Sequence, residues 1–489
     1  MSKFAVVTTS LALIGALFIG TPAAVYAVAN DIYVGSNDSD GGGSCADPDF
    51  STDVSDEGSI NAALDASLAA VDDDGDSVII CDGDYTYAAD ITLHDGAVGH
   101  NVINIEAAPG AEVTLDGGDL WQLLKFANMT SVSVTGIDFL DAQVNANGAA
   151  IEIMGGTLNI VDCSFANGGT ATIDGGAIYS EPGHVTISGS TFTDNRAGSE
   201  GGAVAVENAV DGEGVTVSGS LFTGNSEAEG AAISVNGDSS AAIITVIDSE
   251  FVNNDGTYGA ITIDNGSVEL TNVLMDGNNN TTGEGGAVWA GSGFTATNSE
   301  FVNNSTDGDD GGAVYSGGPL TVGNSVFTGN QALGDGAEGG AIQVEDCGES
   351  ASITRSTFTD NFAESSAGAI NFDCGEGDVV LLSRNKFIGN ISEYGGAVDQ
   401  DGSDQLLIFQ RNVFTANRAV ADDAEGGALW VSNATFSGNR FSRNRSDLLG
   451  GAVYASNKVV ARAALRSQFT SNRARRGQDV YYTRGGGGA

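Results

Sequence analysis

The stretch Phe301-Val-Asn-Asn304, followed by Gly311-Gly-Ala-Val314, decides the fold because both phrases recur along the chain. Phe-x-x-Asn returns about every 27 residues between 192 and 472, and Gly-Gly-Ala with an aliphatic residue returns between its copies. In one copy Met275 takes the place of the Phe. Two phrases that share one period indicate stacked structural units, which form a solenoid.

Short β-branched segments inside each repeat predict that the coils consist of strands. Val185-Thr-Ile187 and Ile261-Thr-Ile263 are examples, and Gly, Asn, Asp or Ser bounds such segments. The chain has 71 Gly and only 5 Pro, which suits many tight corners. Parallel pairing would stack the coils about 4.8 Å apart. We therefore expect a buried stack of Phe side chains and a ladder of Asn side chains that bond from coil to coil.

The two phrases resemble the repeats of the polymorphic outer-membrane protein family over residues 139–482. This resemblance implies a right-handed parallel β-helix and a role like that of autotransported bacterial adhesins. Ahead of the repeats, Ile60, Ala63, Leu64 and Leu68 fall on one helical face. That segment resembles the N-terminal cap of pectin-lyase-like β-helix proteins. The expected fold class is all-β, a right-handed parallel β-helix (solenoid) with a short N-terminal capping helix.

The pattern predicts one folded domain behind a targeting segment. Residues 1–29 have the features of a cleavable secretory signal peptide, with Lys3 ahead of an apolar run. Residues 30–90 are expected to form the N-terminal cap, 91–484 the parallel β-helix and 485–489 a flexible tail. No stretch has the roughly 20 apolar residues of a transmembrane helix. We expect a secreted or cell-surface (extracellular) protein.

Five cysteines in a secreted chain predict disulfides with one thiol left over. Cys45 and Cys81 flank the predicted capping helix and could tie it to the first coil. Cys347 and Cys374 are one period apart, and neighbouring coils would place their Cα atoms about 5 Å apart, within disulfide range. Cys163 is expected to be a small buried residue. The connectivity stays open at this point.

Charge is the second strong signal, because 18 basic and 65 acidic residues give a net charge of −47. Such a surface repels nucleic acid, which we exclude as a partner. The acidic residues gather in two variable parts of each repeat. One lies between the Asn and Gly-Gly-Ala, as in 305–310, and the other follows the Gly-Gly-Ala strand, as in 345–349. Such insertions align on one face of a solenoid, so we expect an acidic strip that binds a partner. A solvated, aggregation-resistant surface is the alternative.

The C-terminal residues invert this charge. From Arg440 to Arg484 there are ten basic residues against Asp447 and Asp479, a net charge of +8. Arg473, Arg475 and Arg476 form the basic end of the rod. A basic end could dock on an anionic surface glycan or on the acidic flank of another copy, which would give head-to-flank self-association. A solvated terminal coil is the alternative.

Catalytic patterns are weak, whereas calcium ligands are abundant. The three histidines are isolated in sequence, and the Asn-Thr-Asp, Asp-Asp and Gly-His-Gly set of galacturonases is not present as a set. We assign no catalytic residue. Flexible loops rich in hard oxygen donors suit calcium, the expected cofactor. Its candidate ligands are Asp38, Asp40, Asp72, Asp74, Asp76, Asp307, Asp309 and Asp310.

These observations favour a secreted or cell-surface, non-enzymatic β-helix protein, adhesin-like or a matrix scaffold, that presents acidic, calcium-binding loops. The expected partner is an extracellular glycan or a surface protein. The alternative is a secreted polysaccharide lyase or glycoside hydrolase of pectin-lyase-like fold. A cluster of two or three Asp with an Arg or Lys over one strand face would favour the enzyme, whereas a uniform acidic strip would favour the scaffold.

Overall fold

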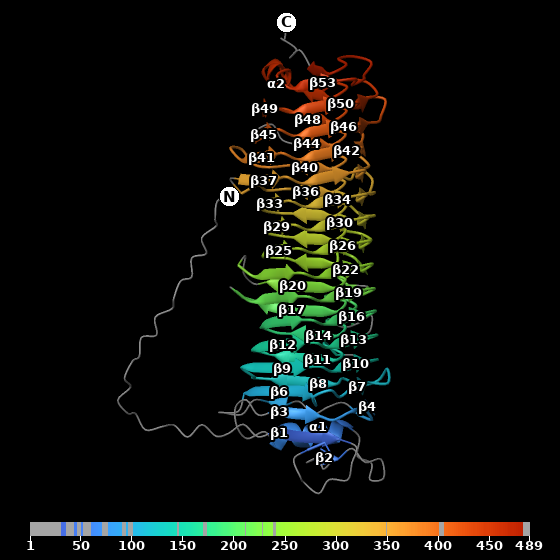
Figure 1. Cartoon of the computed structure of the whole chain (residues 1–489), viewed down its shortest axis with the longest axis vertical. Coiled ribbons are helices and arrows are strands. Elements are labelled where there is room, and N and C mark those ends of the chain that lie inside the picture. The colour runs from blue at the N-terminus through green and yellow to red at the C-terminus, as the bar shows by residue number, and fades with distance from the viewer. Residues whose placement is uncertain are drawn as a thin grey trace, which may run out of the picture.

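The computed structural model is a parallel β-solenoid of about 14 turns, with its strands stacked along one long axis (Figure 1). This confirms the all-β repeat architecture expected from the two phrases. The structure describes residues 31–35, 44–45, 50–51, 60–70, 77–89, 94–95, 101–143, 146–169, 174–210, 212–226, 228–237, 241–348, 350–400 and 405–482.

Four sheets run along the stack, with 16, 15, 15 and 8 strands, here named the first, second, third and fourth sheets. One coil shows the plan. β29 (Gly293–Thr297) lies in the first sheet and β30 (Glu300–Val302), which carries the Phe, lies in the second. β31 (Ser305–Thr306) lies in the fourth sheet and β32 (Val314–Ser316), which follows Gly-Gly-Ala, lies in the third. Neighbouring coils pair in parallel, so that Phe301 stands opposite Phe327.

The strands of the third sheet position the site described below. In stacking order they are β5 (His94–Asp95), β8 (Leu124–Ala127), β11 (Ile151–Met154), β14 (Ile178–Ser180), β17 (Val204–Ala209), β20 (Ile233–Gly237), β24 (Ile261–Ile263), β28 (Val288–Ala290), β32, β36 (Ile342–Val344), β40 (Ile370–Phe372), β44 (Val398–Gln400), β48 (Leu429–Val431), β52 (Val453–Ala455) and β54 (Val480–Tyr482).

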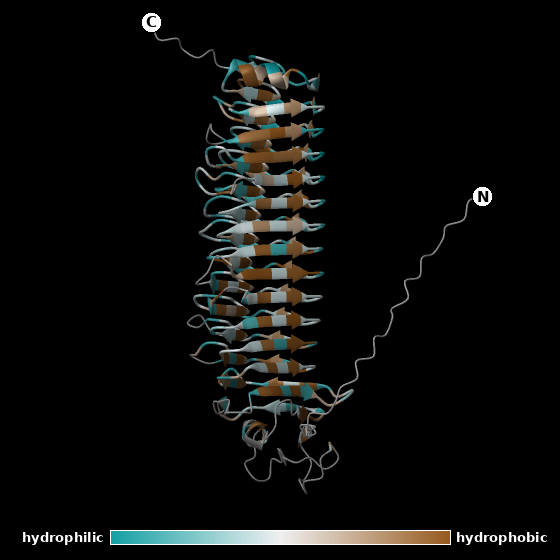
Figure 2. Ribbon diagram, turned by 90° about the vertical axis from the view of Figure 1, so that its left-hand side faces the viewer, coloured by the Kyte–Doolittle hydropathy of each residue, from teal (hydrophilic) through white to brown (hydrophobic). Residues whose placement is uncertain are grey.

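Alternation of apolar and polar residues fixes which side chains of the first sheet face inward. β25 (Ser267–Thr271) buries Val268 and Leu270 completely, while Glu269 between them is exposed. Successive side chains of a strand point to opposite faces, so the aliphatic residues of every coil meet in one interior. Hydrophobic bands recur at the same place on successive coils (Figure 2). The core is therefore a continuous column along the rod.

Gly-Gly-Ala marks the corner that leads into the third sheet. Gly311 has a φ of +71°, a conformation that Gly adopts without steric cost. A Cβ on Gly312 would collide with the carbonyl oxygen of Gly340 on the next coil. The second Gly is therefore required by the close approach of two backbones. Ala313 and Val314, which follow, are fully buried.

The Phe side chains form the predicted interior stack. Phe301 and Phe327 have ring centroids 4.5 Å apart and planes within 1° of parallel. The same arrangement runs from Phe139 to Phe251 and from Phe301 to Phe469. Met275 pairs with Phe251 below and Phe301 above, and so fills the gap in the stack. The substitution inferred from the period is confirmed.

The Asn residues form the predicted ladder, and every bond is buried. Asn304 Oδ1 accepts from the backbone N–H of Asn278 at 3.1 Å and from its Nδ2 at 3.0 Å. Asn304 Nδ2 donates to the Met275 carbonyl at 2.9 Å and to Asn330 Oδ1 at 3.0 Å. One amide thus satisfies backbone groups of the corner and ties its coil to both neighbours.

A second ladder, which the sequence pattern did not reveal, lies at the corner after the first sheet. The backbone N–H of Ser299 donates to Ser325 Oγ at 3.2 Å, and that of Ser325 donates to Ser356 Oγ at 3.2 Å. Higher in the stack Asn replaces Ser, and the N–H of Asn385 donates to Asn412 Oδ1 at 2.9 Å. Two internal ladders therefore hold the register of the coils.

Two helices lie at opposite ends of the described stack (Figure 1). α1 (Ile60–Ala70) contacts β1 (Asp31–Gly35) and β2 (Phe50–Ser51), and it buries Leu64 and Leu68 in the core. α2 (Lys458–Ala464) was not predicted. The first sheet ends at β49 (Ala434–Ser437) although the other two large sheets run one coil further, and α2 packs on β49. This helix covers a sheet edge that would otherwise be open.

Neither of these helices has the length and apolar character needed to cross a membrane.

Candidate functional site

On the third-sheet strands from β8 onward, one residue points away from the core between two residues that face it, although many of these outward residues, such as Ala205 and Asn371, are themselves buried. In β28 Val288 and Ala290 are fully buried while Trp289 lies between them. Equivalent residues pair from coil to coil, as Trp289 does with Tyr315. We name this set the outward column: Lys125, Glu152, Tyr179, Ala205, Ser234, Thr262, Trp289, Tyr315, Gln343, Asn371, Asp399, Trp430, Tyr454 and Tyr481.

Two acidic columns flank the outward column. The leading column is the residue before the Gly-Gly-Ala phrase, and backbone bridges align it, as between Glu200, Glu229 and Tyr258. Its acidic members are Asp174, Glu200, Glu229, Glu284, Asp310, Glu338 and Glu425. The trailing column is the second residue after the outward one, and its acidic members are Glu181, Glu207, Asp264, Glu345 and Asp373. Together the three columns form the acidic strip.

The first concentration of charge in the strip surrounds Glu200. Burial raises the pKa of the Glu200 carboxyl to about 8, and a hydrogen bond with Glu207 and the charge of Asp174 act in the same direction. Burial also raises the pKa of Glu207. Ser234 Oγ donates to Glu200 Oε2 at 3.4 Å. Burial therefore disfavours the ionisation of both carboxyl groups, and the charge of Glu207 opposes the ionisation of Glu200.

The hydrogen bond between Glu200 and Glu207 limits the chemistry of the pair. Glycosidases keep their two carboxyl groups at least about 5 Å apart, so that a glycosidic bond or a water fits between them. Two carboxyl groups that share a proton are closer than that. The arrangement suits hydrogen bonding to a polar ligand and lacks the separation that hydrolysis uses.

The second concentration of charge lies around Asp310, two coils above Asp264. Burial raises the pKa of Asp310 to about 7. The backbone N–H of Glu338, which donates to Asp310 Oδ1 at 2.7 Å, acts in the opposite direction and lowers this pKa. The charges of Glu284 and Glu345 add to the increase. Burial likewise raises the pKa of Glu284. These carboxyl groups lie close enough to oppose one another's ionisation.

Aromatic rings stand between the two concentrations of charge. Trp289 and Tyr315 stack with centroids 5.8 Å apart and planes within 4° of parallel, and Tyr258 meets Trp289 edge-on at 6.1 Å. Trp289 Nε1 donates to Glu284 Oε2 at 3.1 Å, which fixes the indole plane. A hollow of about 260 Å³ opens here, lined by Glu229, Tyr258, Thr262, Asp264 and Trp289. Its wall thus combines an aromatic surface with two carboxylates.

Three of the predicted calcium ligands are among the residues that the structure describes, and five are not. Asp310 belongs to the leading column, while Asp307 and Asp309 are exposed on the loop before it. Within the described ranges, no three His, Cys, Asp or Glu side chains form a group that could hold a metal ion. The other predicted ligands, Asp38, Asp40, Asp72, Asp74 and Asp76, lie outside the described residues.

The cysteine pair Cys347 and Cys374 borders the trailing column, and Arg476 of the basic end continues the leading column on the last coil. Cys45 and Cys81 form a disulfide with Cα atoms 5.5 Å apart, and Cys347 and Cys374 form one at 5.3 Å. Cys163 is a buried free thiol, and its burial raises the pKa to about 11. The three predicted basic-end residues, Arg473, Arg475 and Arg476, are exposed on the last coil.

The outward column was missed by sequence reasoning, which predicted only the acidic loops beside it. Its signal is the single residue between two aliphatic residues directly after Gly-Gly-Ala, as in Val288-Trp-Ala290. In a repeat with fixed neighbours, the position that changes from coil to coil is not set by the repeating interior.

No known protein-family model matches the sequence, and no curated protein is significantly similar to it. The fold and the chemistry of the strip are therefore argued from the residues themselves.

Proposed function

We propose that this protein is a secreted or cell-surface, non-enzymatic β-helix, adhesin-like or part of a matrix, that binds a glycan on the acidic strip. The observation that carries the proposal is the hollow beside Trp289, where an aromatic surface and carboxylates converge. Binding sites for small ligands typically combine aromatic walls with a few placed polar groups. The hollow, at about 260 Å³, is just below the roughly 300–1,000 Å³ typical of such sites and would hold one sugar ring.

The charge of the strip defines the class of glycan. Glu229 and Asp264 line the hollow, and burial raises the pKa of both carboxyl groups, so they can share hydrogen bonds with hydroxyl groups. An anionic sugar would be repelled by these groups and by Glu284 close by. A neutral sugar with many hydroxyls, or an amino sugar with a positive charge, fits the hollow best.

A binding role fits better than cleavage. The strip is acidic over many coils, and no Arg or Lys is among the residues that line the hollow. A lyase or hydrolase would need separated acid and base groups over one strand face, and the Glu200–Glu207 pair is hydrogen-bonded instead. The acidic residues of the strip, with no basic residue lining the hollow, support a scaffold rather than an enzyme.

The test is a titration of the full chain with a neutral cello-oligosaccharide and with a chitosan oligosaccharide, followed by tryptophan fluorescence. Trp289→Ala should weaken binding at least tenfold, because the stacking surface is lost, while Trp289→Phe should retain most of it. Trp121→Phe, remote from the hollow, should bind as the wild type does. Equal binding by Trp289→Ala and the wild type would contradict the proposal.

A reducing-end assay on the same mixtures addresses the enzymatic alternative. The proposed function predicts no release of reducing ends over prolonged incubation. Release that disappears in Glu200→Gln would assign a glycoside hydrolase to the strip instead.

A further inference from the structure

Three arginines occupy a corner of the backbone that elsewhere in the stack belongs to Gly, Asp or Asn. Between Gly136 and Gly438, the corner follows the last residue of the first-sheet strand on every coil and has positive φ. Asn272, Asn298 and Asn324 hold it on three consecutive coils, with φ between 53° and 58°. On the next three coils Arg355, Arg384 and Arg411 hold it, with φ values of 56°, 61° and 56°.

A long side chain in this conformation has a conformational cost that Gly and Asn avoid. The fold does not require Arg there, because the same corner forms with Asn one coil below Arg355. Backbone strain that recurs without a structural need is a reason to look for function.

Among the described residues, the three guanidinium groups have no acidic partner, and the ion pairs Lys125–Glu152 and Arg445–Asp447 lie elsewhere. Arg355, Arg384 and Arg411 are exposed. They line a hollow of about 500 Å³ whose other lining residues are uncharged: Thr354, Ser383, Gln410 and Ser437. In a chain of net charge −47, a local concentration of unpaired positive charge is exceptional.

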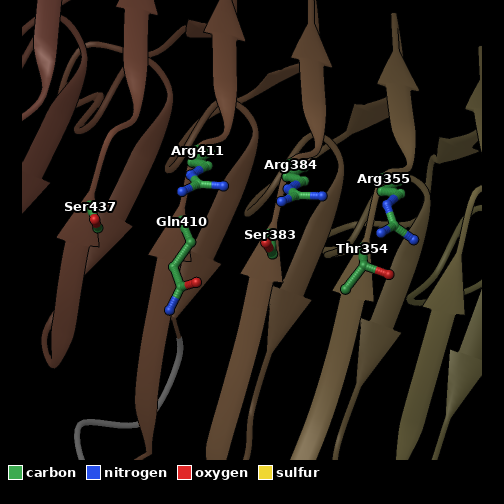
Figure 3. A pocket seen from close by; sticks show the side chains of 7 residues that line it. All are labelled: Thr354, Arg355, Ser383, Arg384, Gln410, Arg411 and Ser437. Atoms are coloured by element: carbon green, nitrogen blue, oxygen red, sulfur yellow. The ribbon is translucent and has the colours of Figure 1, made fainter.

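Backbone bonds hold the arginines in a straight row. They follow β37 (Ser350–Thr354), β41 (Val379–Ser383) and β45 (Leu406–Gln410). The N–H of Arg355 donates to the Ser383 carbonyl at 3.0 Å, and that of Arg384 to the Gln410 carbonyl at 2.9 Å. Strand spacing places successive arginines about 4.8 Å apart. Figure 3 shows the three side chains side by side rather than converging on one point.

The same edge of the rod carries the opposite charge lower in the stack. There a hollow is lined by Asp248, Glu250 and Glu300 among polar and aliphatic residues. Lys386 on β42 (Lys386–Ile388), in the coil of Arg384, and Arg440 on β50 (Arg440–Ser442), one coil above Arg411, are exposed on the adjoining second sheet. Positive charge is therefore confined to one short segment of this edge.

We propose that Arg355, Arg384 and Arg411 form a binding site for an acidic oligosaccharide that carries carboxylate or sulfate groups along its chain. Guanidinium groups bind such groups with two parallel hydrogen bonds. A row with regular spacing favours a ligand whose charges repeat along its length over a single small anion. The Ser, Thr and Gln side chains between the arginines can bond the sugar hydroxyls. Nucleic acid fits less well, because no aromatic side chain lines the hollow to stack on bases.

The experiment measures binding of the full chain to two fluorescent hexasaccharides at about 0.15 M salt, where the Debye length is about 8 Å. One is a carboxylated galacturonate oligomer and the other a sulfated heparin-derived oligomer, so the two arms show which anionic group is recognised. The test variant is R355N/R384N/R411N, which installs the residue used by the three coils below. We expect its Kd for the preferred oligomer to rise at least tenfold while its Tm does not fall.

The matched control is K458Q/R462Q/R466Q, which removes the same charge from α2 and the turn that follows it. We expect its Kd to change less than threefold. Equal losses in the two triple variants would overturn the site, because net charge alone would then explain binding. The absence of binding to both oligomers in the wild type would overturn it as well. Tighter binding of single-stranded DNA than of either oligomer would also overturn the site. A loss of self-association in R355N/R384N/R411N, measured by sedimentation and without any saccharide binding, would instead assign the row to a contact between copies.

Discussion

The interior columns and the outward column stand on the same stacked backbone and follow opposite rules. Inside, Phe327 lies between two other Phe rings, and Asn304 bonds to Asn residues above and below it. Outside, the outward column changes from Trp289 to Tyr315 to Gln343 on three successive coils. Repetition therefore serves stability, because buried groups need identical partners in each coil. Function is to be sought where the repeat is broken, since the residue at those positions is not dictated by the repeating interior.

The largest effect should come from breaking the Asn ladder. Asn304→Leu removes four hydrogen bonds. The backbone N–H and Nδ2 of Asn278 each lose an acceptor, and the Met275 carbonyl and Asn330 Oδ1 each lose a donor. Each unsatisfied buried group costs about 1–3 kcal/mol, so the free energy of unfolding should fall by about 4 kcal/mol or more. Urea unfolding, with hydrogen exchange of the flanking coils, measures this loss.

Thr321→Ala is the matched control for that variant, because Thr321 is exposed on β33 (Leu320–Gly323) in a neighbouring coil. It should change the free energy of unfolding by no more than about 0.5 kcal/mol. Similar stability of the two variants would mean that the ladder does not hold the coils together.

The Phe stack should give the next largest effect. Phe327→Ala removes a fully buried ring and should lower the free energy of unfolding by about 3–5 kcal/mol. Phe327→Met copies the natural break at Met275 and should cost less than about 1.5 kcal/mol. If both substitutions prove equally costly, the stack depends on ring geometry rather than on filled volume.

A smaller effect should appear as a pH dependence of the acidic strip. The pKa of Glu200 is raised from its ordinary value of 4.5 to about 8, so between these values the folded chain holds a proton that the unfolded chain has lost. Stability is then complete below about pH 4.5 and declines as pH rises towards 8. Tm should fall over this range, and Glu200→Gln should flatten the decline. Glu269→Gln, at an exposed position of β25, should leave the slope unchanged.

The smallest effect should come from an exposed ion pair. Arg445 Nη2 and Asp447 Oδ1 are 2.7 Å apart, with the Arg side chain 55% exposed. Pairs of this kind contribute about 0–1 kcal/mol, so Asp447→Asn should unfold at nearly the wild-type urea concentration. A loss as large as that of Phe327→Ala would show that outward charges, and not the interior columns, hold the upper coils.

Much of the fold could be predicted from the sequence because its causes are local and repeated. The period of Phe301 and Asn304 determined the coil, the strands within it and the side chains that face inward. It also located the stack and the ladder, including the break at Met275. Tight burial and parallel pairing leave few residue types acceptable at these positions, so the pattern can be recognised in the sequence alone.

The tertiary structure decided what meets on the surface. Glu200 precedes β17 and Glu207 lies within it, and the hydrogen bond between the two carboxyl groups is not evident from the sequence. Trp289 and Tyr315 are stacked because the strands that carry them pair in parallel on neighbouring coils. The row of Arg355, Arg384 and Arg411 and the helix α2 at the open sheet edge were likewise invisible. The physical reason is that the contacts of the outward side chains, such as that of Trp289 with Glu284, do not follow from the repeated phrases. Loop lengths and the register between coils decide which residues become neighbours of these side chains, and both act together only in the folded stack.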